Sequence, residues 1–245
     1  MRAQSPAYPR HLPIEGTHNF RDLGGYATAT GGVTRWRKLF RSDSLHALTP
    51  AGHQALIDLG IRSSIDLRNE GEVSENPSRM AGDPRLSYVH LPVAGPGLFP
   101  LTKGVRSLGE AHVWRLENAK PSFLRVLETL AGRHRYPAVV NCSAGKDRTG
   151  LVMALLLGIL GVAPESVIED YVLTKQYAAR LLDPFIEARK EEGLEWILGC
   201  APEDMEQALD HLDRRYGGAE GYVREIGLSE AAVGAIRTAL VEPAP

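Results

Sequence analysis

The chain has 245 residues, 43% of them hydrophobic, and its 28 basic side chains nearly balance 30 acidic ones, for a net charge of −2. A chain of this length buries a full core, and its balanced charge excludes a general attraction for nucleic acid or membranes. Length alone permits two domains, but no linker, repeat or low-complexity stretch divides the sequence. We therefore expect one domain over residues 1–245, with residues 1–14 as a flexible N-terminal extension.

Turn and capping residues predict the first elements. Gly31-Gly32 predicts a hairpin turn between residues 26–28 and 33–36. Thr49-Pro50 predicts the start of a helix, and Gly60 predicts its end.

Strands and helices then alternate along the chain. The predicted strands lie near residues 62–67, 86–91 and 137–141, and the helices near residues 121–131 and 149–161. This alternation predicts an α/β fold with a central, mainly parallel sheet flanked by helices. The apolar run 151–162 is too short to cross a bilayer and indicates a buried central helix. Residues 1–6 lack the apolar segment of a secretory signal, so we expect a cytoplasmic location.

The most informative stretch is a heptapeptide that precedes Thr149-Gly150 and reads Cys142-Ser143-Ala144-Gly145-Lys146-Asp147-Arg148. It lies between a predicted strand and a predicted helix. The N-terminus of a helix stabilises both a thiolate, the nucleophilic form of cysteine, and a bound dianion. The pattern therefore indicates cysteine-based hydrolysis of phosphate esters.

Each residue type in this stretch has a chemical role. The small side chains of Ser143, Ala144 and Gly145 let successive backbone amides turn toward one phosphate or sulfate ion. Arg148 matches two phosphoryl oxygens with its planar guanidinium, a geometry that lysine lacks. The Thr149 hydroxyl is expected to contact the sulfur and to help it leave when water breaks the phosphocysteine intermediate.

Residues 142–150 resemble the Cys-x-x-Gly-Lys-Asp-Arg-Thr signature of the atypical bacterial tyrosine and dual-specificity phosphatases, typified by mycobacterial protein tyrosine phosphatase B. Three further motifs resemble that family in order: Asn-Phe-Arg-Asp-Leu-Gly-Gly-Tyr at 19–26, Leu-Phe-Arg-Ser-Asp at 39–43 and Ile-Asp-Leu-Arg at 65–68. The resemblance covers about residues 15–240. It implies a cysteine-phosphatase-like fold with a helical lid insertion, no cofactor or metal, and a phosphorylated protein or phosphoinositide as substrate. Some relatives are exported without a recognisable signal.

Two residues of this region bear on the loop and its substrates. The position before the cysteine is usually His in the family and is Asn141 here. Its amide either helps to organise the loop or satisfies backbone groups at the strand end. In the family resemblance, Lys146 and Asp147 accompany tolerance of phosphoserine, phosphothreonine and phosphoinositides. The alternative for Lys146 is a solvated side chain at the helix start.

Cleavage also needs a general acid that protonates the leaving oxygen, and two aspartates qualify. Asp147 lies in the loop, at a position that the resemblance marks as functional. Asp66 ends a predicted strand, where parallel sheets place their ligand-binding loops. The alternatives are an ion pair with Arg68 or a turn cap for Asp66, and a salt bridge to a loop arginine for Asp147. We rank Asp147 first.

Two segments are candidates for covering the site. Relatives have a helical lid over the phosphate, and the segment of about residues 175–200 is the candidate here, with plain core packing as the alternative. Asp183-Pro184 predicts the start of a helix that carries Phe185 and Ile186 in this segment. The other candidate is the Gly/Pro-rich stretch at residues 95–100.

The remaining motif residues allow structural roles. Arg21 and Asp22 either buttress the loop as an ion pair, which we favour, or fix an N-terminal turn. Cys200 is expected to be a small apolar filler, and a resolving thiol for Cys142 is the alternative. No spacing of His and Cys suits a metal site.

The sequence thus predicts a cysteine-dependent phosphatase with dual-specificity or phosphoinositide activity. Two other functions stay open: a phosphate-binding pseudophosphatase and a sulfurtransferase of the rhodanese type, whose loop is also led by cysteine. Turnover of para-nitrophenyl phosphate excludes the first, and transfer of sulfur from thiosulfate to cyanide identifies the second.

Overall fold

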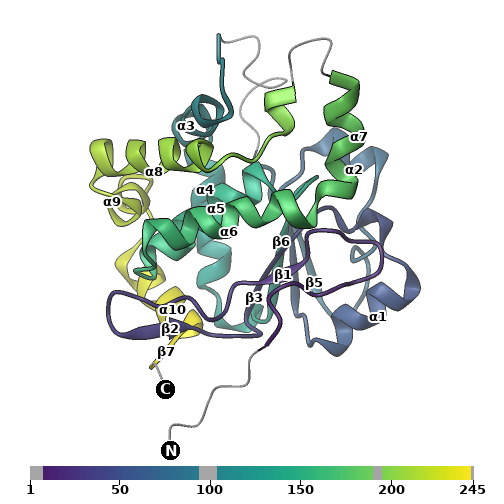
Figure 1. Cartoon of the computed structure of the whole chain (residues 1–245). Coiled ribbons are helices and arrows are strands. Elements are labelled where there is room, and N and C mark those ends of the chain that lie inside the picture. The colour runs from purple at the N-terminus through teal and green to yellow at the C-terminus, as the bar shows by residue number, and fades with distance from the viewer. Residues whose placement is uncertain (1–7, 94–103, 190–194, 244–245) are drawn as a thin grey trace, which may run out of the picture.

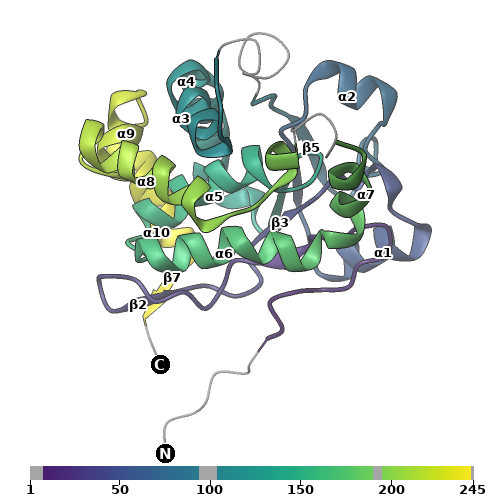
Figure 2. The same ribbon diagram turned by 45° about the horizontal axis from the view of Figure 1, so that its top comes forward.

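The computed structural model describes residues 8–93, 104–189 and 195–243, and Figures 1 and 2 show its fold from two directions. The strands of the described residues are β1 (Arg21–Asp22), β2 (Gly32–Thr34), β3 (Leu39–Ser42), β4 (Ser63–Asp66), β5 (Ser87–His90), β6 (Ala138–Asn141) and β7 (Val241–Pro243). They form a main sheet and a small two-stranded sheet.

The main sheet has the strand order β1-β3-β6-β4-β5. The last four strands of this order run parallel to one another, and the edge strand β1 is antiparallel to β3. The prediction of a central, mainly parallel sheet is therefore confirmed. Ser42 of β3 and Asp66 of β4 both pair with Asn141 of β6. The carboxyl ends of these three strands consequently lie side by side.

The small sheet joins the two ends of the described chain. Strand β2 pairs with β7 in antiparallel register. Strand β2 is also the second strand of the predicted hairpin: the N–H of Thr28 donates to the carbonyl of Gly32 at 2.9 Å, and the N–H of Thr34 donates to the carbonyl of Tyr26 at 2.8 Å. This part of the sequence prediction is confirmed.

Helices surround the main sheet. The α-helices are α1 (Pro50–Asp58), α2 (Glu70–Glu75), α3 (Leu108–Asn118), α4 (Lys120–Ala131), α5 (Asp147–Ile159), α6 (Pro164–Tyr177), α7 (Ala179–Arg189), α8 (Pro202–Tyr216), α9 (Ala219–Glu225) and α10 (Glu230–Leu240). Short 3-10 helices are η1 (Leu45–Ala47), η3 (Arg133–Arg135) and η5 (Glu195–Leu198). In both views α2 and α7 lie on one side of the molecule, and α3, α8 and α9 on the other (Figures 1 and 2).

The central strand β6 contributes side chains to the core on both faces of the sheet. Neighbouring side chains of a strand point to opposite faces of the sheet. Val140 belongs to the large core cluster built around α5, whereas Val139 belongs to a second cluster with Phe40 and with Leu56 of α1. Nearly every residue of α5 is buried. The apolar run 151–162 thus forms most of the buried central helix that the sequence indicates.

The N-terminal extension is shorter than expected. The N–H of Leu12 donates to the carbonyl of Phe20 at 3.1 Å, and Ile14 is 7% exposed within the second core cluster. Residues 10–14 are therefore packed against the domain, because the apolar side chains of Leu12 and Ile14 bury surface there. The prediction of a flexible segment over residues 1–14 is wrong for this part, and residues 1–7 lie outside the described residues.

The start of α7 also differs from the prediction. The helix begins at Ala179, so Asp183 and Pro184 lie inside it and do not cap it. Helix-forming residues directly before Asp183 explain the difference, because they extend the helix by a full turn toward α6. The side chains of Phe185 and Ile186, and the stretch 95–100, lie outside the described residues.

Candidate active site

The heptapeptide forms a loop between β6 and α5, which we call the phosphate loop (residues 142–148). Strand β6 ends at Asn141, and α5 begins at Asp147, two residues before the expected start at Thr149. Arg148 therefore belongs to the first helical turn, where backbone N–H groups have no partner within the helix. The loop also lies at the carboxyl ends of the parallel strands, where α/β proteins bind ligands.

The phosphate loop turns sharply at Gly145, whose φ is +65°. A Cβ atom at this position would lie 2.4 Å from the carbonyl oxygen of Ser42. Glycine is therefore required here by both its left-handed backbone and its close approach to β3. The N–H of Ser44 donates to the carbonyl of Ser143 at 3.0 Å, so the chain after β3 supports the loop at a second point.

Two side chains from the N-terminal motifs bind carbonyl groups of the loop. Arg41 donates from Nη2 to the carbonyl of Gly145 at 2.6 Å, and Asn19 donates from Nδ2 to that of Ala144 at 2.9 Å. A peptide N–H points opposite to the carbonyl of the same peptide group. Holding these carbonyls toward β1 and β3 therefore directs loop N–H groups toward the other side of the loop, an arrangement suited to an anion.

Asp170 of α6 pairs with both arginines behind the loop. Its Oδ1 lies 3.1 Å from Arg21 Nε and its Oδ2 lies 2.5 Å from Arg41 Nη1. All three side chains are at most 1% exposed. Burial alone would raise the pKa of Asp170, but the two guanidinium groups lower it to about 2. An ionised, buried cluster thus supports the phosphate loop.

The expected ion pair between Arg21 and Asp22 does not form. Arg21 binds Asp170, whereas Asp22 accepts hydrogen bonds from the N–H groups of Gly24 and Arg37, each at 2.8 Å. Adjacent side chains in a strand point to opposite sides, which separates this pair in β1. The two residues therefore divide the roles left open by the sequence: Arg21 buttresses the loop, and Asp22 fixes a turn.

Glu72 of α2 orients Arg148. The guanidinium donates from Nη1 to Glu72 Oε2 at 2.6 Å and from Nη2 to Oε1 at 2.8 Å, and Nη2 also donates to Ser143 Oγ at 2.8 Å. Burial alone would raise the pKa of Glu72, but Arg148 lowers it to about 2. The pair is therefore ionised at neutral pH. Because arginine carries five N–H donors, it retains donors for a phosphate.

Lys146 and Asp147 bind each other. Lys146 Nζ lies 2.7 Å from Asp147 Oδ1 and donates to the carbonyl of Ile197 in η5 at 3.2 Å, and its side chain is 2% exposed. His112 Nε2 lies 3.2 Å from the same Oδ1 atom. Burial alone would raise the pKa of Asp147, but Lys146 and then His112 hold it well below its usual range. Lys146 is therefore buried and not the solvated side chain that the sequence offered as an alternative.

Asp66 ends β4 beside the phosphate loop. Its Oδ1 accepts from Arg68 Nε at 3.0 Å, and its Oδ2 accepts from Arg68 Nη2 at 2.6 Å and from the Tyr88 hydroxyl at 3.0 Å. Asp66 is fully buried. It forms the ion pair with Arg68 that the sequence offered as its alternative role, and both of its oxygens are engaged.

Cys142 and the side chains of Asn141 and Thr149 are buried. Cys142 is 2% exposed and lies close enough to Arg115 and Arg148 for their charges to interact. Within the described part of the chain, neither the Thr149 hydroxyl nor the side-chain amide of Asn141 has a hydrogen-bond partner. The expected contact between Thr149 and the sulfur stays a prediction, as does the role of Asn141.

The second cysteine is part of the core. Cys200 is 7% exposed, and its thiol donates to the carbonyl of Tyr171 at 3.2 Å. Burial raises the pKa of the Cys200 thiol to about 11. These surroundings favour the apolar filler over the resolving thiol, because a resolving cysteine reacts as an accessible thiolate.

The order of these motifs also matches a known family. A model described as the tyrosine phosphatase family matches residues 12–242. The chain belongs to this family. The phosphatase is 31% identical to a tyrosine-protein phosphatase of Nostoc commune, over 82% of this chain and 73% of the relative. It is 28% identical to the triple specificity protein phosphatase PtpB of Mycobacterium tuberculosis, over 95% of this chain and 99% of the relative.

Similar solved structures are more distant. The catalytic core of Siw14 has a TM-score of 0.45 and 10% sequence identity, over 81% of the phosphatase and 87% of that chain. The crystal structure of TpbA from P. aeruginosa has a TM-score of 0.38 and 17% identity, over 89% of the phosphatase and 95% of that chain.

A cavity of about 360 Å³ lies beside the phosphate loop of the phosphatase. Ser143 and Ala144 form part of its lining, and Glu72 of α2 forms another part. Leu181 and Leu182 of α7 and Leu198 of η5 complete an apolar wall. Residues of the candidate lid segment therefore line this cavity. Closure of this segment over a substrate stays a prediction.

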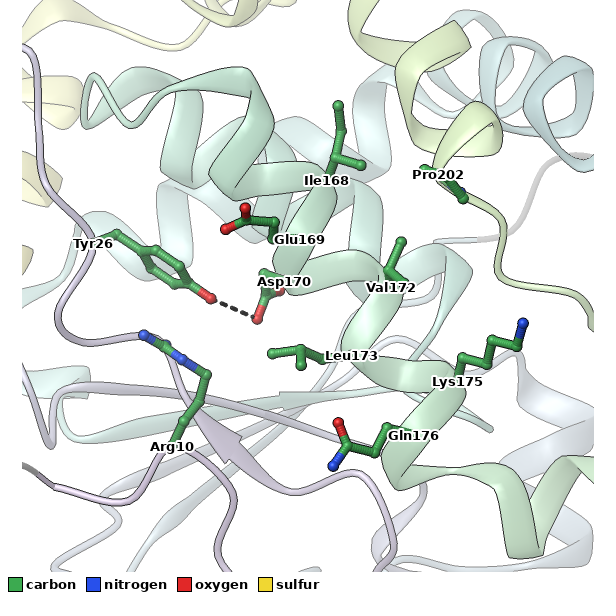
Figure 3. Close-up of a pocket in the computed structure, with 10 residues that line it drawn as sticks. All are labelled: Arg10, Tyr26, Ile168, Glu169, Asp170, Val172, Leu173, Lys175, Gln176 and Pro202. Carbon is green, nitrogen blue, oxygen red and sulfur yellow. Dashed lines mark hydrogen bonds between the residues drawn. The ribbon is translucent and has the colours of Figure 1, made fainter.

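A second hollow, of about 760 Å³, lies along α6. Figure 3 shows its lining, where the hydroxyl of Tyr26 donates to Asp170 Oδ1 at 3.2 Å. None of the residues that line it belongs to the phosphate loop. It adjoins the support behind the loop and not the phosphate site itself.

The structure reveals site residues that the sequence analysis missed. They are Glu72 beside Arg148, Asp170 behind the loop, and His112 and Arg115 of α3 beside Asp147 and Cys142. Glu72 had a sequence signal, because Asn69-x-x-Glu72 forms a capping box whose two bonds are present. That signal predicts a helix start but not a contact with the phosphate loop.

No helix in the described residues is long and apolar enough to cross a membrane. Over the same residues, no group of three or more His, Cys, Asp or Glu side chains is arranged to hold a metal ion. The cytoplasmic location stays a prediction.

Proposed function

We propose that this tyrosine phosphatase hydrolyses phosphate monoesters through a phosphocysteine formed on Cys142. The observation that carries the proposal is the placement of Cys142 directly after β6, at the start of the phosphate loop that leads into α5, with Arg148 oriented over the same loop by Glu72. The thiolate attacks phosphorus and the P–O bond to the leaving group breaks. Water then attacks the phosphocysteine, which releases phosphate and restores the thiolate.

The phosphate loop is suited to stabilise the transition state. Its N–H groups and the first turn of α5 supply donors, and Arg148 supplies a charged, planar pair of donors. Donors that are fixed before the reaction contribute most, because they need not reorganise as charge develops. The bonds from Arg41, Asn19 and Glu72 support this preorganisation. We infer that the loop binds free phosphate or sulfate by the same contacts.

We assign the general acid to Asp147. It lies in the loop next to Arg148, and its side chain is 20% exposed, so that a substrate can reach it. The competing assignment to Asp66 is weaker, because Arg68 and Tyr88 already occupy both oxygens of that fully buried carboxylate. Asp66 is better suited to positioning Arg68.

We extend the proposal to phosphoserine and phosphothreonine as well as phosphotyrosine in proteins. The name of the M. tuberculosis relative, triple specificity protein phosphatase, supports a broad range. Phosphoinositide hydrolysis has less support. A lysine ammonium free to bind a second phosphate would favour it, but that of Lys146 is bound to Asp147 and to the carbonyl of Ile197.

The decisive experiment follows the phosphoryl group. The protein is mixed with a phosphotyrosine peptide, quenched with acid at short times, digested and weighed by mass spectrometry. We expect phosphate release and a transient gain of one phosphoryl group on the peptide that contains Cys142. Absence of both would indicate a pseudophosphatase, and a persulfide on Cys142 formed from thiosulfate would indicate a sulfurtransferase. Phosphoserine, phosphothreonine and phosphoinositide substrates in the same assay measure the range.

Replacing Glu72 with glutamine should lower kcat/KM for para-nitrophenyl phosphate about tenfold or more. The charge-assisted pair with Arg148 represents about 1.5–3 kcal/mol of interaction, and its loss releases the guanidinium from its orientation. Glu75→Gln is the matched control, because Glu75 lies on the same helix and lines the same cavity. Equal kinetics for both variants would show that Glu72 does not orient Arg148.

A further inference from the structure

His112 of α3 is buried against Asp147. The imidazole is fully buried, with the ring of Tyr171 edge-on at a centroid distance of 5.6 Å. Its Nδ1 atom lies 3.2 Å from the carbonyl oxygen of Asp204, and its Nε2 atom lies 3.2 Å from Asp147 Oδ1. Helix α3 thus delivers a second titratable group directly to the aspartate that we assign as the acid.

These two contacts determine how many protons the pair holds. A carbonyl oxygen only accepts hydrogen bonds, so Nδ1 carries a proton that it donates to Asp204. The remaining contact joins Nε2 to a carboxyl oxygen. It is a hydrogen bond only if a proton lies between them, either on Nε2 or on the carboxyl group. The pair of His112 and Asp147 therefore holds one proton in addition to the proton on Nδ1.

The charges around the pair decide where this proton rests in the free enzyme. Lys146 Nζ lies 2.7 Å from Asp147 Oδ1, and Arg115, on the same helix as His112, also acts on Asp147. Both cations stabilise the carboxylate and therefore favour the proton on Nε2 over the proton on the carboxyl group. On the side of α6, the uncharged ring of Tyr171 faces the imidazole. The carboxylate of Asp204 is engaged by the N–H of Ala201 at 3.0 Å.

We propose that His112 stores the proton that Asp147 delivers to the leaving group, so that these two residues act as one acid. This inference rests on the proposed function. A bound phosphate brings negative charge next to Asp147 and favours movement of the proton from Nε2 to the carboxyl group. As Cys142 attacks and the P–O bond breaks, the electron pair remains on the leaving oxygen. That oxygen takes the proton from Asp147.

The second half of the reaction restores the proton. When water attacks the phosphocysteine, its proton passes to the Asp147 carboxylate and from there to Nε2, while the S–P electron pair returns to Cys142. Burial supports this route: the imidazole is fully buried, whereas the carboxyl group of Asp147 is 20% exposed. Protons therefore reach His112 through Asp147. His112 is a positioning residue that acts on the substrate only through Asp147.

The test measures kcat/KM of the variants His112→Gln and Asp147→Asn on substrates with a poor and a good leaving group. Glutamine can still donate a hydrogen bond to Asp147 but has no proton to transfer. A general acid accelerates hydrolysis about 10²-fold or more for a substrate with a poor leaving group, and little for a substrate with a good one. We therefore expect kcat/KM of His112→Gln to fall about 10²-fold for phenyl phosphate and less than about threefold for 2,4-dinitrophenyl phosphate. The double variant should resemble Asp147→Asn alone.

His211→Gln is the matched control, because His211 of α8 also pairs with a carboxylate, Glu117, outside the site. It should retain both activities. If His112→Gln lost kcat/KM equally on both substrates, the proposal would be overturned and His112 would have a purely structural role. Phosphocysteine formation in the wild-type protein separates this result from failure of the proposed function, because the intermediate forms in either case.

A measurement on the unaltered protein guards against a variant that does not fold. Nitrogen-15 NMR of histidine-labelled protein distinguishes protonated from unprotonated ring nitrogens. We expect both nitrogens of His112 to carry protons in the free enzyme at neutral pH, with the signal assigned from its absence in His112→Asn or by through-bond correlation. An unprotonated Nε2 in the free enzyme would overturn the proposal.

Discussion

Replacing Cys142 with serine should reduce the turnover of para-nitrophenyl phosphate by about 10⁴-fold or more, the scale expected when a covalent hydrolase loses its nucleophile. A serine hydroxyl is almost completely protonated at neutral pH, and it is therefore a much weaker nucleophile than a thiolate. The substitution changes one buried atom, so the fold should persist. Steady-state kinetics and a thermal unfolding curve measure both effects.

The second cysteine provides the control for this experiment. Cys200→Ser lies in the core and outside the phosphate loop, so it should retain turnover with, at most, lower stability. Full activity of Cys142→Ser would refute the phosphocysteine mechanism. Equal inactivation of both variants would point to a general loss of structure, which the unfolding curves would show.

Replacing Asp170 with asparagine should lower the free energy of unfolding by about 3–5 kcal/mol, because it leaves the buried charges of Arg21 and Arg41 without their counter-ion. Asparagine keeps the size but has one acceptor oxygen where Asp170 uses two, so the loss combines the charge with one hydrogen bond. Activity should also fall, since Arg41 holds the carbonyl of Gly145. Urea unfolding followed by circular dichroism measures the change.

The difference in the free energy of unfolding between the wild-type protein and Asp170→Asn should depend on pH. The pKa of Asp170 is about 2 in the folded protein, below its ordinary value of 3.8. Its stabilising contribution is therefore fully present above pH 3.8 and is lost as the pH falls through about 2. The difference between the wild-type protein and Asp170→Asn should shrink over this range. Glu169→Gln, at the exposed neighbouring position, should stay within about 0.5 kcal/mol of wild type. A loss below 1 kcal/mol for Asp170→Asn would contradict the role of the buried cluster.

Local patterns accounted for the elements but not for all of their ends. Thr49 caps α1 by accepting from the N–H of Gly52 at 3.0 Å, as the Thr-Pro pair predicts. The predicted start of α7 is wrong, because Asp183-Pro184 lies inside the helix and not at its beginning. The N-terminal prediction failed because the burial of Ile14 depends on a core formed by distant residues.

The same distinction applies to the site. The phosphate loop was predicted from consecutive residues, since the strand, the turn at Gly145 and the start of α5 are all local. The residues that contact the side chains of this loop were not predicted, because they come from positions far along the chain. Glu72 is 76 residues from Arg148, and His112 is 35 residues from Asp147.

The sequence by itself determined the α/β order of elements and singled out Cys142 and Arg148 as the proposed nucleophile and phosphate-binding residue, because each depends on residue type and short-range spacing. Tertiary structure decided which carboxylate is engaged elsewhere, which cations surround Asp147, and which helix orients Arg148. These outcomes depend on how strands and helices pack. Packing brings together charges whose separation along the chain carries no signal of their contact.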